Sequence, residues 1–122
     1  MDFLNYNWAD SDVESINIGY DKAMLVIWND SIQKRLSVEC SGFAGITNLC
    51  IWDDTIIMSA SVYPVCGADN EFLSNLYTAY NINKDYGGRS LSSGLIELRI
   101  ELANYISFSV YCQKIEVVEC NA

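Results

Sequence analysis

The feature that most constrains the fold lies in the last third of the chain, where apolar and polar residues alternate over two long runs. Alternation with a period of two is typical of β-strands that bury one face. The apolar positions of the two runs are Ile96, Leu98, Ile100, Leu102, Ile106, Phe108, Val110 and Cys112. Asn104 lies between the runs as a turn residue, so the sequence predicts a long amphipathic hairpin. Residues 114–119 are expected to continue extended after a bulge at Gln113.

Earlier segments have the same spacing over shorter lengths. Residues 13–20, 23–28 and 32–40 are separated by turn-forming residues and predict a three-stranded meander. Residues 46–52 and 56–63 predict a second hairpin, in which these two strands pair with each other. Together with the C-terminal hairpin, the segments predict a mostly antiparallel sheet of about seven strands.

One segment changes to helical spacing. In residues 71–80, EFLSNLYTAY, apolar and aromatic side chains recur every three or four positions. Asp69 or Asn70 can cap the first turn, and Glu71 suits the positive end of a helix. We therefore expect one main helix at about 70–80. The predicted fold class is α+β, in a single domain that spans residues 1–122.

The composition is acidic. The chain has 16 Asp and Glu residues against 7 Lys and Arg residues, which gives a net charge of −9. Nucleic acid and anionic membranes repel such a surface, so neither is an expected partner. A basic protein or a cation is compatible with it, and solubility alone is the other interpretation.

The N-terminal sequence bears on the compartment. No stretch has the run of about 20 apolar residues that a membrane span needs. Residues 1–12 carry Asp2, Asp10 and Asp12 and no basic residue, unlike a secretory signal. We therefore expect a cytoplasmic protein, and a signal removed before this sequence begins is the alternative.

The cysteines agree with that expectation. They are Cys40, Cys50, Cys66, Cys112 and Cys120. An odd number cannot pair completely within one chain, and without any His the usual zinc patterns fail. Cys40, Cys50 and Cys112 fall in apolar segments, which favours buried, reduced thiols. A secreted domain with disulfides is the alternative.

Three short motifs are candidate ligand sites, and each has a simpler interpretation. Asp53-Asp54 could bind a hard cation, but turn preference favours a solvated turn. Gly42-x-x-Gly45 lacks the Lys of a phosphate loop and precedes a strand, which favours a backbone turn. Gly87-Gly88-Arg89-Ser90 could hold an anion, although the acidic surroundings oppose it. We expect no metal and no cofactor.

The residues that catalysis requires are missing. The chain has no His. A Lys or a carboxylate could replace it as the activating base, but no Cys or Ser lies beside one in a recognisable motif. We therefore expect no catalytic residues and a protein that is not an enzyme. A metal-dependent hydrolase that uses Asp53 or Asp54 stays open as an alternative.

The polar side of the C-terminal hairpin carries side chains suited to protein recognition. The candidate partner-binding residues are Glu97, Arg99, Glu101, Tyr105 and Tyr111. Tyr and Arg are enriched where proteins bind one another, and charges set the choice of partner. An ordinary solvated sheet face is the other interpretation.

The chain as a whole resembles the small acidic immunity proteins of bacterial polymorphic-toxin and contact-dependent inhibition systems. The resemblance rests on size, charge, the absence of catalytic motifs and the final segment LIELRIELANYISFSVYCQKIEVVE, with its apolar face and Cys112. It implies a cytosolic protein that binds and blocks one toxin, often a basic nuclease. A small-ligand-binding or oligomeric domain is the competing interpretation.

Overall fold

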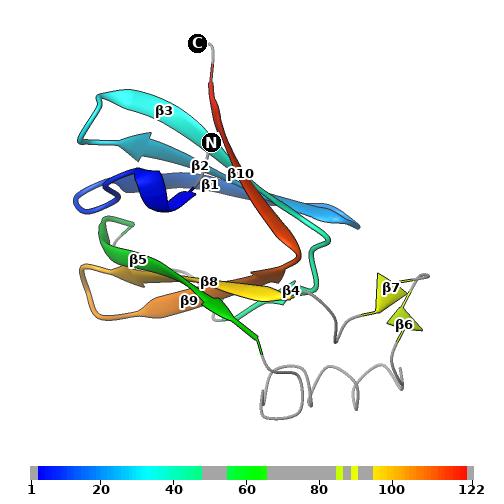
Figure 1. Cartoon of the computed structure of the whole chain (residues 1–122). Helices are drawn as coiled ribbons and strands as arrows, with labels where there is room; N and C mark the ends of the chain where they lie inside the picture. Colours follow the sequence, from blue (N-terminus) through cyan, green and yellow to red (C-terminus); the bar gives the residue numbers. More distant parts are fainter. Residues whose placement is uncertain (1–2, 48–54, 66–84, 87–88, 91–94, 121–122) are drawn as a thin grey trace.

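The apolar faces of the meander and of the C-terminal hairpin cover each other in a β-sandwich, as Figure 1 shows. The computed structural model describes residues 3–47, 55–65, 85–86, 89–90 and 95–120. Two four-stranded sheets contain most of these residues. The first sheet has the order β1 (Asp12–Ile18), β2 (Lys22–Asn29), β3 (Lys34–Ser41) and β10 (Lys114–Glu119). The second sheet has the order β4 (Gly45–Ile46), β9 (Ser107–Cys112), β8 (Ile96–Leu102) and β5 (Ile57–Pro64).

The remaining described elements are short. A single turn of 3-10 helix, η1 (Phe3–Asn5), begins the described chain. The strands β6 (Asp85–Tyr86) and β7 (Arg89–Ser90) pair only with each other. Every strand pair in the two main sheets is antiparallel.

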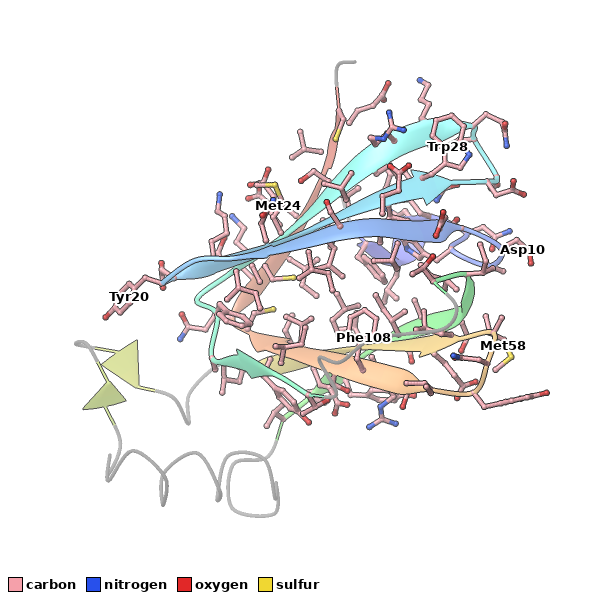
Figure 2. The ribbon with its side chains drawn as sticks, turned by 180° about the vertical axis from the view of Figure 1, so that it is seen from behind. Asp10, Tyr20, Met24, Trp28, Met58 and Phe108 are labelled. Carbon is pink, nitrogen blue, oxygen red and sulfur yellow. The ribbon has the colours of Figure 1, made fainter. Side chains whose placement is uncertain are left out.

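One hydrophobic core lies between the two main sheets. The first sheet contributes Leu25, Ile27, Leu36 and Val38, and all four are fully buried. The second sheet contributes fully buried residues from β5, β8 and β9, and Figure 2 shows Phe108 between the sheets. Each strand thus buries one face against the opposite sheet, which is the stable solution for two amphipathic sheets.

The expected α+β class is wrong, because the described residues form a mainly β structure. Within them, the turn of η1 is the only helical element. The main helix expected at about 70–80 falls outside the described residues. The prediction combined one mostly antiparallel sheet of about seven strands with one main helix, and the apolar face of such a sheet needs another layer against it. In the structure, a second sheet supplies that layer.

The expected hairpin between residues 46–52 and 56–63 is not formed by the described residues 46–47 and 56–63, and residues 48–52 lie outside the described part of the chain. β4 and β5 lie at opposite edges of the second sheet, with the β8–β9 hairpin between them. β4 pairs with β9, and β5 pairs with β8. The described residues of these two segments therefore pair with the long hairpin and not with each other.

The predicted meander and C-terminal hairpin are confirmed. β1, β2 and β3 follow one another as antiparallel neighbours, and so do β8 and β9. Leu98, Ile100, Leu102, Phe108 and Val110 all lie on the predicted apolar face with no exposed surface. The extension over residues 114–119 is confirmed as well, but β10 leaves the hairpin and joins the first sheet.

Two connections pass between the sheets side by side, at the right of Figure 1. One runs from β3 to β4 through Gly42, and the other runs from β9 to β10 through Gln113. The Gln113 amide donates a hydrogen bond to the Ser41 carbonyl oxygen at 2.9 Å. Gly42 has a φ of 64°, and the Gln113 side chain occupies the space that a β-carbon at Gly42 would need. Gly42 is therefore the position at which the crossing needs a residue without a side chain.

Gly42→Ala is expected to destabilise the protein by about 2 kcal/mol, because two costs add. A left-handed φ disfavours any L side chain. A β-carbon at Gly42 would also lie 2.8 Å from the Gln113 β-carbon, so that residue must move. The measurement is urea unfolding of the parent and the variant. Gly19→Ala is the control, since its β-carbon would meet only the Lys22 carbonyl oxygen at 3.4 Å. Equal midpoints for the two variants would contradict this account of Gly42.

No helix among the described residues is both long enough and apolar enough to span a membrane.

Candidate protein-recognition surface

The five residues proposed from the sequence do not form one exposed surface. Glu97 and Tyr111 face each other on β8 and β9, and Tyr63 on β5 lies opposite Glu97 on the other side. Glu97 is only 7% exposed and Tyr111 only 6% exposed. The predicted alternation places both on the outer face of the second sheet, but neither is exposed there.

Glu97 is the centre of a polar network on this outer face. Its Oε2 atom accepts a hydrogen bond from Arg99 Nε at 2.9 Å and one from Ser109 Oγ at 2.6 Å. The Arg99 guanidinium lies over the Tyr63 ring, 4.6 Å from its centroid. The hydrogen bond to Glu97 raises the pKa of Arg99, although burial opposes the shift. Glu97 and Arg99 thus form an ion pair in which their opposite charges offset each other.

Tyr105 lies apart from this network, at the tip of the β8–β9 turn. Its side chain is 82% exposed, the largest exposed fraction among the large apolar and aromatic residues described. The Tyr105 amide donates to the Leu102 carbonyl oxygen at 2.9 Å, and the Leu102 amide donates to the Ile106 carbonyl oxygen at 2.8 Å. This is a three-residue hairpin loop, whose last loop residue takes a left-handed conformation.

The conformation of Tyr105 is unfavourable for its residue type. Its φ is 68°, in a region that favours glycine and that costs other residues about 1 kcal/mol or more. Among the described non-glycine residues, only Asp10, Gln33 and Tyr105 have a positive φ. All three lie in turns at the same end of the sandwich, at the left of Figure 1.

Backbone hydrogen bonds join the turns at this end. The Ala103 amide, next to the β8–β9 turn, donates to the Ile56 carbonyl oxygen at 2.8 Å. The Asp10 amide donates to the Ile57 carbonyl oxygen at the same distance. The start of β5 therefore holds the β8–β9 turn on one side and the N-terminal segment on the other.

Two buried polar side chains extend this connection to the β2–β3 turn. Ser11 is fully buried, and its Oγ accepts a hydrogen bond from the Asp30 amide at 3.1 Å. Asn29 is also fully buried, and its Nδ2 donates to the Asn7 carbonyl oxygen at 3.1 Å. Buried polar groups with satisfied hydrogen bonds fix one arrangement of the segments they join. These hydrogen bonds thus hold the turns together at one end of the sandwich.

We call this surface the loop end and define it by Asp10, Asp30, Ile32, Met58 and Tyr105. Ile32 is 43% exposed and Met58 39% exposed, so this end of the sandwich has exposed apolar groups in addition to Tyr105. Figure 2 shows Asp10 and Met58 at this end, and Tyr20 at the opposite end. The loop end combines exposed apolar groups with carboxylates.

The charges of the loop end differ from those of the first sheet. On the first sheet, four ion pairs join opposite charges, and they are Lys22–Glu39, Lys34–Glu119, Arg35–Glu14 and Lys114–Glu116. Within the part of the chain that the structure describes, no Lys or Arg pairs with Asp10, Asp12 or Asp30. The negative potential of these carboxylates is therefore not cancelled by adjacent described cations.

A small open pocket adjoins the loop end. Its volume is about 250 Å³, and residues 6–9 and 58–60 line it. The Trp8 ring stacks on Phe3 with 4.6 Å between centroids, and Trp8 Nε1 donates to the Phe3 carbonyl oxygen at 2.8 Å. The aromatic wall of the pocket is thus held in place by its own contacts.

The other candidate motifs are described only in part. Gly42 lies in the connection into β4 with a left-handed φ of 64°, and Gly45 is the first residue of β4. Asp53, Asp54, Gly87 and Gly88 lie outside the described residues. Among the residues with described positions, no group of three or more Cys, Asp or Glu side chains is placed to hold a metal ion.

The sequence predicted Tyr105 as a candidate but not the other residues of the loop end. Asp10, Asp30 and Met58 come from segments far apart in the chain, and only the fold brings them to one end. The signal available in the sequence was a tyrosine after Asn104 in a tight turn, where glycine is usual.

Comparisons with known proteins give no relative. No family model matches the sequence, and no curated protein and no solved structure matches it.

Proposed function

We propose that this protein is a non-enzymatic binding domain that recognises a basic protein through its loop end. The observation that carries the proposal is Tyr105, which is 82% exposed and has a φ of 68°. A glycine would satisfy the turn at lower conformational cost. Strained residues that persist in folded proteins cluster at functional sites. An exposed tyrosine provides large contact area with few rotatable bonds, so it suits a recognition surface.

The charge distribution supports a basic partner. The chain has a net charge of −9, and the carboxylates of Asp10, Asp12 and Asp30 have no cationic partner among the described residues. Carboxylates at a binding surface attract a basic protein and raise the rate of encounter. Arg99 and Glu97 contribute less to this attraction in the proposal, because they pair with each other.

The resemblance to immunity proteins makes a bacterial toxin the specific partner class that we propose. Binding at the loop end would inhibit the toxin by covering its active surface, without any chemistry by this chain. We place the protein in the cytoplasm. Free Cys40, Cys112 and Cys120 are compatible with a reducing compartment.

A small-molecule ligand is the second candidate, because the pocket beside residues 6–9 and 58–60 offers a concave site. Its volume of about 250 Å³ is below the usual range for ligand pockets, which begins at about 300 Å³. Trp8 is only 4% exposed and packs against Phe3. We therefore favour the protein partner.

The experiment begins with capture of interacting proteins on the immobilised chain, followed by purification of each candidate. A true partner forms a stoichiometric complex with the purified protein. We expect its association rate to fall about tenfold between roughly 50 mM and 500 mM salt, since salt screens the carboxylates. The double variant Asp10→Asn, Asp30→Asn should associate more slowly and depend less on salt.

The control is Tyr20→Ala, which removes an exposed tyrosine at the opposite end of the sandwich. This variant should bind with parental rates. An association rate that changes neither with salt nor with the two Asn substitutions would contradict the proposed surface. A small molecule that raises the melting temperature, with no protein partner found, would favour the second candidate.

A further inference from the structure

Two buried cysteines meet where the chain passes between the sheets. Cys40 is on β3 in the first sheet, and Cys112 is on β9 in the second sheet. Both have no exposed surface, both belong to the core between the sheets, and neither is in a disulfide. They are the inward-facing residues next to the two connections that pass through Gly42 and Gln113.

The backbone brings these two positions together. The residues that directly follow them, Ser41 and Gln113, are joined by the hydrogen bond from the Gln113 amide to the Ser41 carbonyl oxygen at 2.9 Å. On the other side of Cys112, the Tyr111 carbonyl oxygen accepts from the Ala44 amide at 2.8 Å. The two strand ends are thus tied on both sides of Cys112. Inward-facing side chains at Cys40 and Cys112 must therefore approach each other.

The thiols are in contact. The hydrogen bond with the Cys112 sulfur, together with burial, raises the pKa of the Cys40 thiol well above its usual range. The same hydrogen bond lowers the pKa of the Cys112 thiol, and burial opposes that shift. Neither cysteine has exposed surface, so a reagent can reach the sulfurs only when the connections at Gly42 and Gln113 open locally.

We propose that Cys40 and Cys112 form an intramolecular disulfide between the two sheets when the protein meets a thiol oxidant such as oxidised glutathione. One cysteine thiolate attacks the glutathione disulfide and displaces one glutathione thiolate, which leaves a mixed disulfide on the protein. The second cysteine thiolate attacks the protein sulfur of that mixed disulfide and displaces the second glutathione. The two protein thiols are oxidised by two electrons, one glutathione disulfide is reduced, and both protons end on the released glutathione thiols.

The bond would act as a covalent tie across the core. It would close a loop that contains β4, β5 and β8 and would join the sheets where the chain passes between them. A crosslink that closes a long loop lowers the entropy of the unfolded chain and stabilises the fold. The reduced protein would thus gain stability under oxidising conditions, independently of any partner.

The experiment treats the folded, fully reduced protein with oxidised glutathione and then blocks free thiols in denaturant. We expect the oxidised protein to take up two fewer blocking groups than the reduced protein, with a corresponding mass loss and no glutathione retained on Cys40 or Cys112. Peptide mapping without reduction should identify a peptide pair that joins these two residues. The melting temperature should rise by about 10 °C and return to its starting value after reduction.

Two variants make the result specific. Cys112→Ala removes one partner, so the mass loss and the rise in melting temperature should disappear. Cys120→Ser changes a partly exposed cysteine and should retain both effects. Since the mapping is done on the parental protein, the test does not depend on whether Cys112→Ala folds. Oxidation that leaves Cys40 and Cys112 free, or that joins them only when the protein is first unfolded, would overturn the proposal.

Discussion

Ile100→Asp is expected to abolish cooperative folding. Ile100 has no exposed surface and lies on β8 between Ala60 on β5 and Phe108 on β9. A carboxylate there would lose its hydration without gaining a partner, because the surrounding residues form the core cluster. The cost should exceed about 4 kcal/mol, a large part of the total stability of a small domain. Circular dichroism and thermal melting measure the effect.

Glu101→Ala is the matched control at the next position. Glu101 lies on the opposite face of β8, half-buried beside Ser59 and Ser107. Its removal should change stability by no more than about 0.5 kcal/mol. A larger loss for Glu101→Ala than for Ile100→Asp would show that the register assigned to β8 is wrong by one residue.

Tyr105→Ala is expected to increase the rate of dissociation from the partner by about tenfold to a hundredfold. Tyrosines near the centre of an interface commonly provide 1 kcal/mol or more of the binding free energy, and sometimes above about 2 kcal/mol. Tyr105 is 82% exposed in the free protein, so most of its surface is available for burial. The association rate should change much less, because no charge is removed.

The measurement is surface plasmon resonance with the purified partner. Tyr20→Ala again serves as the control, since Tyr20 is 68% exposed at the other end of the sandwich. If Tyr105→Ala and Tyr20→Ala dissociate at the same rate as the parent, the loop end is not the binding surface.

The sequence predicted which side of each long strand is buried, because a period of two is a local property. Ile100 and Phe108 illustrate this, since both lie on the predicted apolar face. The pattern does not identify the neighbouring strand. β5 was expected to pair with the segment before it, but it pairs with β8. Pairing of segments distant in the sequence depends on the whole fold and leaves little local signal.

The same limit explains the result for the polar face of the hairpin. Alternation predicted that Glu97 points outward, but Tyr63 on β5 and Tyr111 on β9 flank it on that face. With Arg99 and Ser109 bonded to its carboxylate, Glu97 is 7% exposed. Burial of a polar residue by its cross-strand neighbours becomes predictable only when the strand order is known.

The prediction of the fold class was wrong for a related reason. The alternating strands require a partner layer for their apolar faces, and a helix and a second sheet satisfy this requirement equally well. The sequence contains one amphipathic helical pattern at about 70–80, which favoured the helix. The chain instead divides its strands between two sheets, and Gln113 marks the point where β10 departs from the hairpin.

The loop end could not be predicted as a surface, although parts of it were visible. Tyr105 was identified as a candidate, but Asp10 and Asp30 belong to other turns, which only the fold brings to the same end of the sandwich. Ser11 and Asn29 hold these turns together from buried positions. Short polar residues of this kind look like ordinary turn residues in a sequence.

The central claim, that Tyr105 is kept for recognition at a cost in stability, is tested most directly by Tyr105→Gly. The substitution relieves the left-handed φ of 68° and removes the exposed ring. We predict that the variant is more stable than the parent by about 0.5–1 kcal/mol in urea unfolding. We also predict that it dissociates from the partner at least about ten times faster. A variant that loses stability, or that keeps the parental dissociation rate, would contradict the claim.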